Sequence, residues 1–436
     1  MSSSYKPFRL IDDIQSHTDI VLLSPSATSV ELEWLSNGSF FEVCVFKNGS
    51  TVKKIKTKEK RITVEGLEQG VEYSVVVKSK SEESNPRLFV TGDYLGKVVN
   101  YLHPQDLTYS FSGRYLASPS IVRFKNDLYV SMDVFHSADQ KGAFNLTLLY
   151  RSTDDGKTWT YVTDIVPSFW GRLFVANNHL CILAADSEAG SLVVMKSENG
   201  YDWSAPTYLH YGCGTSVSCG IHKSTSAYTM IDGKLYFALE YGGYGIKRFD
   251  TFVACLDLNK DACEKSAWTF SKKARVEFEW SESGDKNIRF AIEGNAIEKD
   301  GKLFILSRYA SKKALMWKFD TSNPSLPPEF HKVVDFEAGH CKFCIQEAEG
   351  GNYYAMGNTS CYPRHIIRLY HSKDLEHWEA LQTLEDISSF SGEQDGIQYP
   401  DFFIENGMLY TVLRNALHEA HSFHDSNAIV FKKYNL

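Results

Sequence analysis

A short turn followed by a β-strand pattern recurs six times over most of this 436-residue chain. The copies begin at Asn126, Asn178, Asp232, Asp300, Gly351 and Asn406, at intervals of 51 to 68 residues. A repeat of this length built only from strands indicates sheets arranged radially around an axis. No segment has the 3.6-residue apolar period of an amphipathic helix, which excludes a parallel α/β sheet. The repeat therefore predicts an all-β fold with a six-bladed β-propeller at residues 94–436.

A propeller has to close, because an open ring leaves the edge strands of its first and last blades unpaired. The last blade has three strands of its own, at Tyr399–Ile404, Leu409–Arg414 and Ala428–Tyr434. The segment Gly96–Leu102 precedes the first blade and is the candidate for the fourth strand. We therefore expect the two ends of the repeat region to share one sheet.

Residues 1–93 form a separate unit in this interpretation. Their alternating strands are separated by Asn37-Gly38 and Asn48-Gly49, which are turn dipeptides typical of antiparallel pairs. Tyr73, in the stretch from Leu67 to Val77, and Trp34 on an earlier strand resemble the fibronectin type III family of β-sandwiches. The resemblance implies that Trp34 fills the core and that Tyr73 makes a hydrogen bond at a corner of the sandwich. A structural spacer is the favoured role, with carbohydrate or partner binding as the alternative.

Charge and hydropathy exclude several classes of partner. The chain has 46 basic and 54 acidic residues, a net charge of -8, and no block of Lys and Arg that could follow a phosphate backbone, so nucleic acid is not expected. No apolar run reaches the roughly 18 residues of a membrane span. Met1 is followed by serines rather than by an export signal, so we expect a cytoplasmic location, or secretion if a signal was trimmed. Nine cysteines, an odd number, suit a reducing compartment.

The segment Ser152–Trp159 reads S-T-D-D-G-K-T-W and matches the Asp-box, S-x-D-x-G-x-T-W, of sialidase-like propellers. Partial copies follow at Ser197–Trp203 and Ser372–Trp378. In that family the Asp and Gly hold a tight turn between outer strands, and the Trp packs between blades. The motif indicates the fold rather than an activity, because it also occurs in propellers that only bind.

The inner strands of a propeller converge on a central channel, so the starts of these strands and the ends of the second strands share one pocket. Aligning the six repeats brings polar and charged residues of both signs there, which is typical of a site for a polar substrate. The inner-strand starts carry Ser118, Arg172, His222, Lys223, Glu293, Asn295, Lys342, Gln398 and Tyr399. The second-strand ends carry Asp133, Glu188, Glu240, Arg308, Asn358 and Arg414. Aromatic residues make up 14% of the chain, and aromatic rings stack on sugar faces.

Three of these segments are similar to sialidase motifs. Glu293 followed by Arg308 resembles the inner-strand Glu and the Arg that ends the next strand. Arg364 resembles the third arginine of that family, and Tyr399 resembles its nucleophile. The resemblance implies that Tyr399 attacks the anomeric carbon while Glu293 removes its proton, and that Asp139 on the first-blade loop serves as acid/base.

One sialidase motif is absent. Sialidases carry Arg-Ile-Pro on the first inner strand, where the Arg completes a three-arginine clamp on the substrate carboxylate, but the aligned residues here are Ala117-Ser118-Pro119. Arg414 also stands where sialidases usually have Glu. We therefore expect a terminal, acidic sugar other than an ordinary sialoside, with Arg114, Arg172 or Lys342 as candidates to replace the missing arginine.

The prediction is an exo-acting glycoside hydrolase with a glycan as its partner and no cofactor or metal. The predicted catalytic residues are Tyr399, Glu293, Asp139 and His222. The predicted substrate-binding residues are Arg172, Lys223, Arg308, Lys342, Arg364, Arg414, His421 and His424. Two alternatives stay open: a polysaccharide lyase, in which Tyr399 or His222 takes a proton beside a uronate carboxylate, and a non-catalytic sugar-binding propeller.

Two small clusters suggest other chemistry less strongly. His421, His424 and Asp425 lie close together near the C-terminus, as a metal site or an acid/base pair would, but a polar loop is favoured. Cys341 and Cys344 form a C-x-x-C without the second half of a zinc motif, so we expect buried thiols on a strand.

Overall fold

The computed structural model describes residues 18–135, 145–214, 219–277 and 291–436. Within these ranges the chain is all-β, as predicted, and its helical segments are two three-residue 3-10 turns, Tyr244–Ile246 (η1) and Lys265–Ala267 (η2). No helix in this part of the chain is long and apolar enough to cross a membrane.

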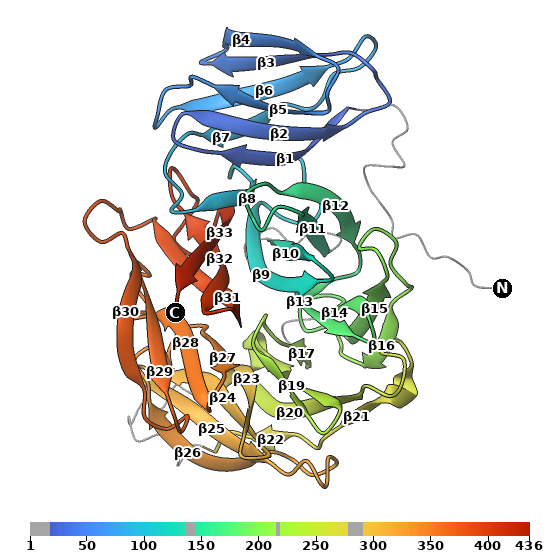
Figure 1. Cartoon of the computed structure of the whole chain (residues 1–436), viewed down its shortest axis with the longest axis vertical. Helices are drawn as coiled ribbons and strands as arrows, with labels where there is room; N and C mark the ends of the chain where they lie inside the picture. The colour runs from blue at the N-terminus through green and yellow to red at the C-terminus, as the bar shows by residue number, and fades with distance from the viewer. Residues whose placement is uncertain (1–17, 136–144, 215–218, 278–290) are drawn as a thin grey trace, which may run out of the picture.

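Two antiparallel sheets make up the N-terminal unit, which lies at one end of the longest axis of the molecule (Figure 1). One sheet pairs in the order β1 (Asp19–Pro25), β2 (Ser29–Leu35), β5 (Arg61–Glu65). The other pairs in the order β4 (Ser50–Thr57), β3 (Phe41–Lys47), β6 (Glu72–Lys78), β7 (Arg87–Val90).

Trp34 and Tyr73 of this unit make the contacts that the sequence predicts. Trp34 is buried, and its ring meets the ring of Phe41 from the other sheet edge-on, with the centroids 5.4 Å apart. The hydroxyl of Tyr73 accepts a hydrogen bond from the backbone N–H of Glu68 at 3.0 Å. The resemblance to fibronectin type III domains itself stays a prediction.

Six further antiparallel sheets, each with at least four strands, follow in the described part of the chain. The first contains β9 (Tyr115–Phe124), β10 (Asp127–Phe135), β11 (Leu146–Ser152) and β12 (Thr160–Ile165). The second contains β13 (Phe169–Ala176), β14 (His179–Ala185), β15 (Leu192–Ser197) and β16 (Thr207–His210). The third contains β17 (Gly220–His222), β18 (Tyr228–Ile231), β19 (Lys234–Gly243), β20 (Arg248–Asp257), β21 (Trp268–Phe270) and β22 (Ala274–Arg275).

The remaining three sheets complete the series. The fourth contains β23 (Ile292–Lys299), β24 (Lys302–Ala310), β25 (Lys313–Phe319) and β26 (Glu329–Asp335). The fifth contains β27 (Cys344–Ala348), β28 (Asn352–Asn358), β29 (Ile366–Ser372) and β30 (Glu379–Asp386). The sixth contains β31 (Gly396–Glu405), β32 (Met408–Ala416), β33 (Ala428–Asn435) and β8 (Lys97–Tyr101).

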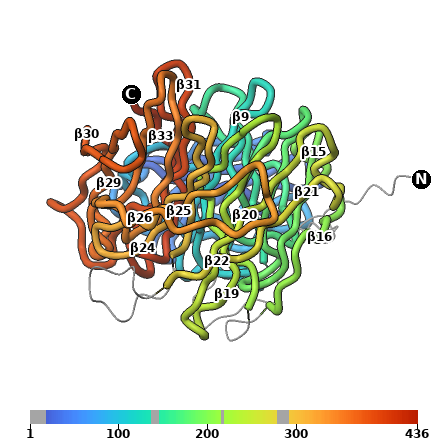
Figure 2. Tube along the Cα trace, turned by 90° about the horizontal axis from the view of Figure 1, so that it is seen from below, coloured from blue at the N-terminus to red at the C-terminus, as the bar shows by residue number. Residues whose placement is uncertain are grey.

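The six sheets surround a common centre, and their first strands lie innermost (Figure 1). The inner strand β9 contacts both β13 of the second sheet and β31 of the sixth, so the first and last sheets are neighbours. Figure 2 shows the end of this ring that lies opposite the N-terminal unit, where β20, β24, β25 and β26 are seen. The arrangement is that of a propeller.

The ring closes through the strand β8, which precedes the first sheet in the sequence but pairs with β33 in the sixth. Ala428 and Ile429 face Tyr101 and Asn100 across this antiparallel ladder. The expectation that the segment before the first blade supplies the missing strand is therefore confirmed. Closure removes an edge strand that would otherwise be free to pair with other chains.

Three turns between outer strands, those that resemble the Asp-box, share one hydrogen-bond pattern. In each, the first serine accepts a backbone N–H of the turn: Ser152 from Gly156 (2.8 Å), Ser197 from Gly200 (2.8 Å) and Ser372 from Leu375 (2.9 Å). The buried Trp159 that ends the first turn packs against Phe431 of the sixth sheet, with the ring centroids 5.4 Å apart. These turns stabilise the blades and their contacts and lie away from the centre of the ring.

A belt of buried polar side chains joins each of the six sheets to the next. Five residues, each at most 4% exposed, form this polar belt: Ser120, Arg172, Asn295, Lys342 and Asp401. Three of them accept backbone N–H groups of neighbouring repeats: Ser120 from Leu173 (3.0 Å), Asp401 from Ile121 (2.8 Å), and Asn295 from Ala227 (3.0 Å) and Ile345 (3.3 Å). The other two donate to backbone oxygens of neighbouring repeats: Arg172 to Thr225 (3.2 Å) and Lys342 to Pro400. Every junction of the ring has at least one such bond.

Asp401 joins three consecutive sheets of the ring. Its carboxylate forms an ion pair with Arg172 of the second sheet while also accepting the N–H of Ile121 in the first. Both side chains of the ion pair are almost completely buried. A buried charge is tolerated only when it is paired, so this ion pair ties three sheets to one geometry.

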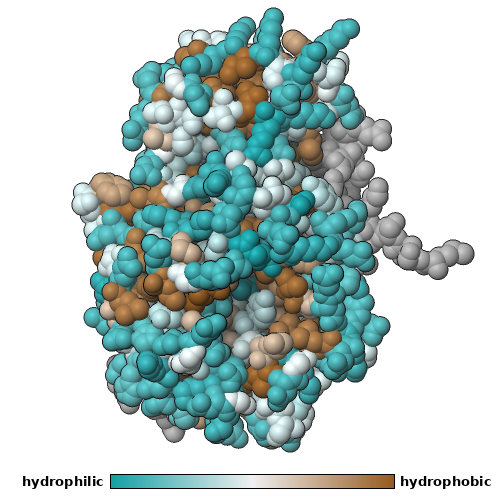
Figure 3. All heavy atoms as spheres, in the orientation of Figure 1, coloured by the Kyte–Doolittle hydropathy of each residue, from teal (hydrophilic) through white to brown (hydrophobic). Residues whose placement is uncertain are grey.

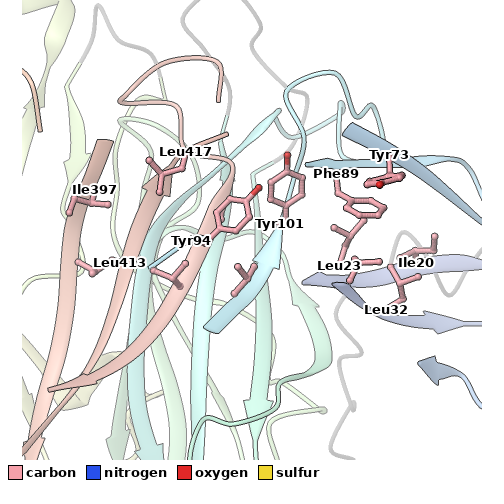
Figure 4. Close-up of a cluster of buried hydrophobic side chains, with 14 of the residues drawn as sticks. Ile20, Leu23, Leu32, Tyr73, Phe89, Tyr94, Tyr101, Ile397, Leu413 and Leu417 are labelled. Carbon is pink, nitrogen blue, oxygen red and sulfur yellow. The ribbon is translucent and has the colours of Figure 1, made fainter. Parts of the chain in front are cut away.

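A hydrophobic cluster continues from the N-terminal unit into the sixth sheet (Figure 4). Leu23 and Phe89 belong to the N-terminal unit and Leu413 to β32, while Tyr94 and Tyr101 lie between them with their ring centroids 5.8 Å apart. A fully buried ion pair between Arg87 and Asp106 lies nearby. The N-terminal unit is therefore packed against the ring over a continuous core.

The face of the molecule seen in Figure 3 is mainly hydrophilic, and its hydrophobic side chains lie in separate small groups. Large continuous apolar patches mark surfaces that bind other proteins or membranes. This face has the scattered pattern of an ordinary solvated surface.

We expect Asp401→Ala to lower the free energy of unfolding by about 3–5 kcal/mol, because the substitution leaves the buried Arg172 charge without its partner. Urea denaturation followed by tryptophan fluorescence measures the change. Asp335→Ala is the matched control: this carboxylate is 87% exposed beside Lys313, and its removal should change the free energy by no more than about 0.5 kcal/mol. A loss below about 1 kcal/mol for Asp401→Ala would contradict the role of the ion pair in holding the three sheets together.

Candidate active site

Four of the six inner strands contain a β-bulge at the same register. The bulged pairs are Ser118-Pro119, Trp170-Gly171, Glu293-Gly294 and Tyr399-Pro400, where two residues face one on the second strand. The first residue of each pair has a positive φ, between 46° and 58°. Non-glycine residues rarely adopt this conformation, and it concentrates at functional sites. A bulge re-aims side chains that the regular alternation of a strand would send elsewhere.

The first residue of each bulged pair lines one central cavity of about 310 Å³. The other residues of its wall come from the inner strand β17, from the second strands and from the loops at the same end of the ring. They are Phe135, Glu188, His222, Ser224, Thr225, Tyr244, Arg308, Arg364, Arg414 and His424. The cavity thus combines ionisable groups of both signs with aromatic rings, as a site for a polar substrate does.

Three arginines converge on Tyr399. The guanidinium carbon of Arg414 lies 4.5 Å from the centre of the Tyr399 ring, and that of Arg364 lies 5.5 Å from it. Arg308, at the end of β24, donates a hydrogen bond to Glu293 Oε2 at 3.1 Å. The cavity therefore presents three cations against the carboxylates of Glu293 and Glu188.

Glu293 is held in its ionised form by its neighbours. Burial by itself would raise the pKa of this carboxyl, but the cation of Arg308 holds the pKa below its usual range. An ionised carboxylate on the wall of a cavity can accept a proton from a substrate or from a neighbouring hydroxyl.

A second set of groups forms a hydrogen-bonded chain across the third sheet. The buried Glu240 carboxylate binds His222 Nδ1 at 2.9 Å and also accepts the N–H of Gly294 at 3.1 Å. His222 Nε2 lies 3.0 Å from the hydroxyl of Tyr244. Because Glu240 accepts the Nδ1 proton, Nε2 is left to accept the proton of the phenol. Trp170 and the third-sheet residue Phe249 pack on His222, each with its ring centroid 4.8 Å from that of the imidazole.

Seven of the predicted site residues line the cavity. They are Tyr399, Glu293, His222, Arg308, Arg364, Arg414 and His424. Their roles stay predictions, but the structure brings them to one wall from three different sheets and two loops. Asp139, the predicted acid/base, lies outside the described residues.

Three predicted substrate-binding cations lie beneath the cavity rather than on its wall. Arg172 and Lys342 belong to the polar belt, and Lys223 donates to the backbone oxygen of Trp170 at 2.6 Å. All three are at most 4% exposed. Burial, aided by the nearby charge of Arg172, lowers the pKa of Lys223 to about 7. The repeat alignment brought these cations to the correct depth, but Arg172 follows the bulge at Trp170-Gly171, and Lys223 and Lys342 bind backbone oxygens of neighbouring repeats.

The histidines near the C-terminus share one carboxylate. Asp425 binds Nδ1 of His421 at 2.8 Å and Nδ1 of His424 at 2.9 Å. His424 reaches the cavity wall, whereas the side chain of His421 is 63% exposed. This arrangement fits the predicted polar loop, which orients His424.

One group of possible metal ligands occurs among the described residues, at Glu72, His103 and Glu419, away from the cavity. His103 Nδ1 accepts the backbone N–H of Gln105 at 3.1 Å, so its other nitrogen carries the proton. That nitrogen lies 3.2 Å from a Glu72 oxygen, but the two atoms are not aligned as a hydrogen bond. Glu72 and Glu419 are exposed carboxylates, which are common at protein surfaces without a metal.

Sequence reasoning missed Trp170, Tyr244 and Phe135. A signal for Trp170 was present, because Trp170-Gly171 repeats the pattern of Glu293-Gly294, a residue followed by Gly or Pro at the start of an inner strand. Tyr244 lies in η1 between β19 and β20 and follows no repeat. Its approach to His222 depends on the path of that connection, for which the sequence has no marker.

Comparison with known proteins identifies the fold. The sequence matches no family model, and no curated protein matches it. Among solved structures, the chain is similar to the Hadza microbial sialidase Hz136, with a TM-score of 0.52 and 13% identity over 99% of this chain and 98% of that one. Trypanosoma rangeli sialidase gives 0.52 and 15% identity over 78% of this chain and 58% of that one. An α-L-arabinanase of Penicillium chrysogenum gives 0.50 and 13% over 78% and 97%. The chain therefore has a sialidase-like propeller fold, whose neighbours include glycoside hydrolases.

The stability of the protein should depend on pH through Asp133, whose carboxyl group binds the backbone of the bulge at Trp170. Its carboxyl accepts the N–H of Trp170 at 2.7 Å and the hydroxyl of Thr147 at 2.6 Å, and burial raises its pKa to about 6. An unfolded Asp has a pKa near about 3.9, so the folded state binds more protons between these values, and stability falls as pH rises from about 4 to about 6. The fall in the free energy of unfolding should be roughly 1.4 kcal/mol per unit of pKa difference. Asp133→Asn should remove this fall, because an amide does not titrate. Parallel denaturation profiles of the two proteins across this range would contradict the prediction.

Proposed function

We propose that this protein is an exo-acting glycoside hydrolase that removes a terminal, acidic sugar from a glycan. The observation that carries the proposal is the convergence of Tyr399, the ionised Glu293 and three arginines on one central cavity. A cavity formed at the centre of a ring accepts a chain end more readily than the middle of a polymer.

The charge of the cavity supports an anionic substrate. Three guanidinium groups face two carboxylates, and one of those, Glu293, is already paired with Arg308. Guanidinium groups bind carboxylates strongly because they donate two parallel hydrogen bonds. A sugar that carries a carboxylate would satisfy the two cations that lie over Tyr399.

Arg414 is the candidate to replace the missing clamp arginine. The first inner strand has Ser118 where sialidases have Arg, but Arg414 of the sixth sheet reaches toward the first sheet, with its guanidinium 5.9 Å from the ring centre of Tyr115. In this proposal Arg308, Arg364 and Arg414 hold the substrate carboxylate. The third cation comes from a different strand, which would change the orientation of the sugar and so the identity of the substrate.

In the proposed mechanism Tyr399 attacks the anomeric carbon. A phenol has an unperturbed pKa near about 10, so its oxygen needs a base, and Glu293 is the candidate. Arg364 and Arg414 stabilise the negative charge that develops on the phenol. A neutral tyrosine also avoids the repulsion between a carboxylate nucleophile and an anionic sugar. One T. rangeli sialidase structure is described as a covalent intermediate with 2,3-difluorosialic acid, which supports covalent chemistry on this fold.

A proton must also reach the leaving oxygen. Asp139 is the predicted donor, as the resemblance to sialidases implies. The chain from Glu240 through His222 to Tyr244 is a second candidate, because it holds a phenol on the wall of the cavity and connects that phenol to a histidine.

The hydrogen-bonded series of Glu240, His222 and Tyr244 is the observation that favours a second function, a lyase acting on uronate-containing glycans. Elimination requires a base that removes the proton next to a carboxylate and cations that stabilise the resulting charge. His222, oriented by Glu240, could withdraw the Tyr244 proton and create such a base. Product analysis separates the functions: a lyase yields an unsaturated sugar that absorbs in the ultraviolet, a hydrolase yields a reducing end without absorbance, and a binding protein yields neither.

We also propose that residues 1–93 are a fibronectin type III-like domain that acts as a spacer, and that residues 94–436 are the catalytic unit. The Trp34 and Tyr73 contacts support the first assignment. The cavity lies entirely within the second unit.

Tyr399→Phe should reduce turnover on a substrate identified from a panel of terminal acidic glycans by roughly a thousandfold or more, since it removes only the attacking oxygen. Initial rates from paired reducing-sugar and absorbance assays measure the effect. Tyr410→Phe, in the same sheet but outside the cavity, should keep the wild-type rate. Full turnover by Tyr399→Phe would overturn the nucleophile assignment.

Arg308→Ala should weaken binding of the acidic sugar by about tenfold to a hundredfold, the scale of a charged hydrogen bond worth ~1.5–3 kcal/mol. Isothermal titration with the product sugar measures the affinity. Arg275→Ala, at an exposed guanidinium beside Asp250, is the control and should leave the affinity unchanged. An unchanged affinity for Arg308→Ala would instead indicate a neutral sugar.

A further inference from the structure

Two cysteines meet directly behind the wall of the cavity. Cys361 is exposed on the loop between β28 and β29, and Cys341 is buried just before β27. The thiol of Cys341 donates a hydrogen bond to the backbone oxygen of Ser360, the residue before Cys361, at 3.3 Å. The two thiols also interact with each other.

Arg364 connects this thiol pair to the cavity. Its Nε donates to the backbone oxygen of Cys361 at 3.2 Å, and its Nη2 lies 4.0 Å from the Cys361 sulfur. The third nitrogen, Nη1, donates to the Gln398 side chain. One guanidinium therefore contacts the sulfur on one side and lines the cavity on the other.

The groups around Cys361 favour a thiolate. The charged and titratable side chains that face it are Cys341, Arg364, Arg308 and His340. The contact with the Cys341 thiol, together with the cations of Arg364 and Arg308, lowers the pKa of Cys361 to about 4 against the opposing effect of burial. The same contact raises the pKa of Cys341, so that Cys341 keeps its proton. An exposed thiolate beside a second thiol is the arrangement of a reactive cysteine and its resolving partner.

We propose that Cys361 is a redox modification site, which hydrogen peroxide oxidises and which Cys341 then resolves to a disulfide. The Cys361 thiolate attacks one oxygen of the peroxide, the O–O bond breaks, and the departing oxygen takes a proton and leaves as water. The Cys341 sulfur then displaces the hydroxyl of the sulfenic acid: the S–S bond forms, the S–O bond breaks, and a second water leaves with the Cys341 proton. The protein loses two electrons, and the peroxide gains them.

The modification would be transmitted to the cavity through Arg364. In the reduced state the negative sulfur of Cys361 lies beside this guanidinium, and the disulfide removes that charge. The new bond also ties the loop that carries Arg364 to the residues before β27. Oxidation would therefore change the affinity of the cavity for anions. The thiol chemistry itself does not depend on the proposed hydrolysis and is measured without any substrate.

The pH dependence of alkylation tests the thiolate directly. In the full-length protein, the rate at which iodoacetamide modifies Cys361, measured by peptide mass spectrometry, should stay nearly constant from pH 5 to pH 8. At pH 5 it should be roughly thirtyfold faster than for an ordinary thiol, after allowing for the lower nucleophilicity of a low-pKa thiolate. The same protein unfolded in urea is the comparison, and there the rate at Cys361 should rise about tenfold per pH unit. The same rise for Cys361 in the folded protein would overturn the proposal.

Oxidation with hydrogen peroxide tests whether Cys341 is the resolving partner of Cys361. Low concentrations of hydrogen peroxide should produce a Cys341–Cys361 disulfide, seen as a loss of 2 Da from the linked peptides, which dithiothreitol reverses. Cys341→Ser should instead accumulate a sulfenic acid on Cys361 that dimedone traps, while Cys344→Ser, which removes a neighbouring buried thiol, should still form the disulfide. Absence of this disulfide in the wild-type protein, or a disulfide between other cysteines, would refute the proposal.

Discussion

The polar belt around the axis is the constraint on which the rest of the structure depends. Each sheet of the ring reaches the next through a buried hydrogen bond, and Asp401 and Arg172 also join the sixth sheet to the second as an ion pair. Hydrophobic packing between sheets tolerates sliding, because it has no direction. A buried charge or N–H does not, because leaving it unpaired costs several times the energy of a typical contact. The belt therefore determines the angle at which each inner strand presents its side chains.

The candidate site follows from this arrangement. Directly before four of the sheet-to-sheet contacts the inner strand bulges, and the bulge turns Ser118, Trp170, Glu293 and Tyr399 toward the axis. The residue two positions later, such as Asp401 after Tyr399, is anchored in the belt. Strain in the backbone of the bulge is thus compensated by buried hydrogen bonds beside it. This pairing explains how unusual conformations persist at four equivalent positions, and it gives the proposed nucleophile and base a rigid support.

The sequence was informative about the site wherever the chemistry followed the repeat. The register of the six copies predicted that Tyr399, Glu293, Arg308 and Arg414 would share a pocket, and the structure brings them together. The same register failed for Arg172, because a bulge inserts an extra residue and a shift of one position reverses the face of a strand. Arg172 follows such a bulge and points into the belt. Contacts made by irregular loops, such as Tyr244 with His222 and Cys361 with Arg364, had no pattern from which to infer them.

The amino-acid sequence by itself determined the all-β class, the six-fold repeat, the strand that closes the ring and the depth at which the polar side chains lie. It could do so because alternation and turn residues are local and recur at a regular interval. The tertiary structure alone decided which of those side chains line the cavity and which join the sheets. That choice depends on bulges and on partners up to 280 residues away, and their energies exist only once the ring has closed.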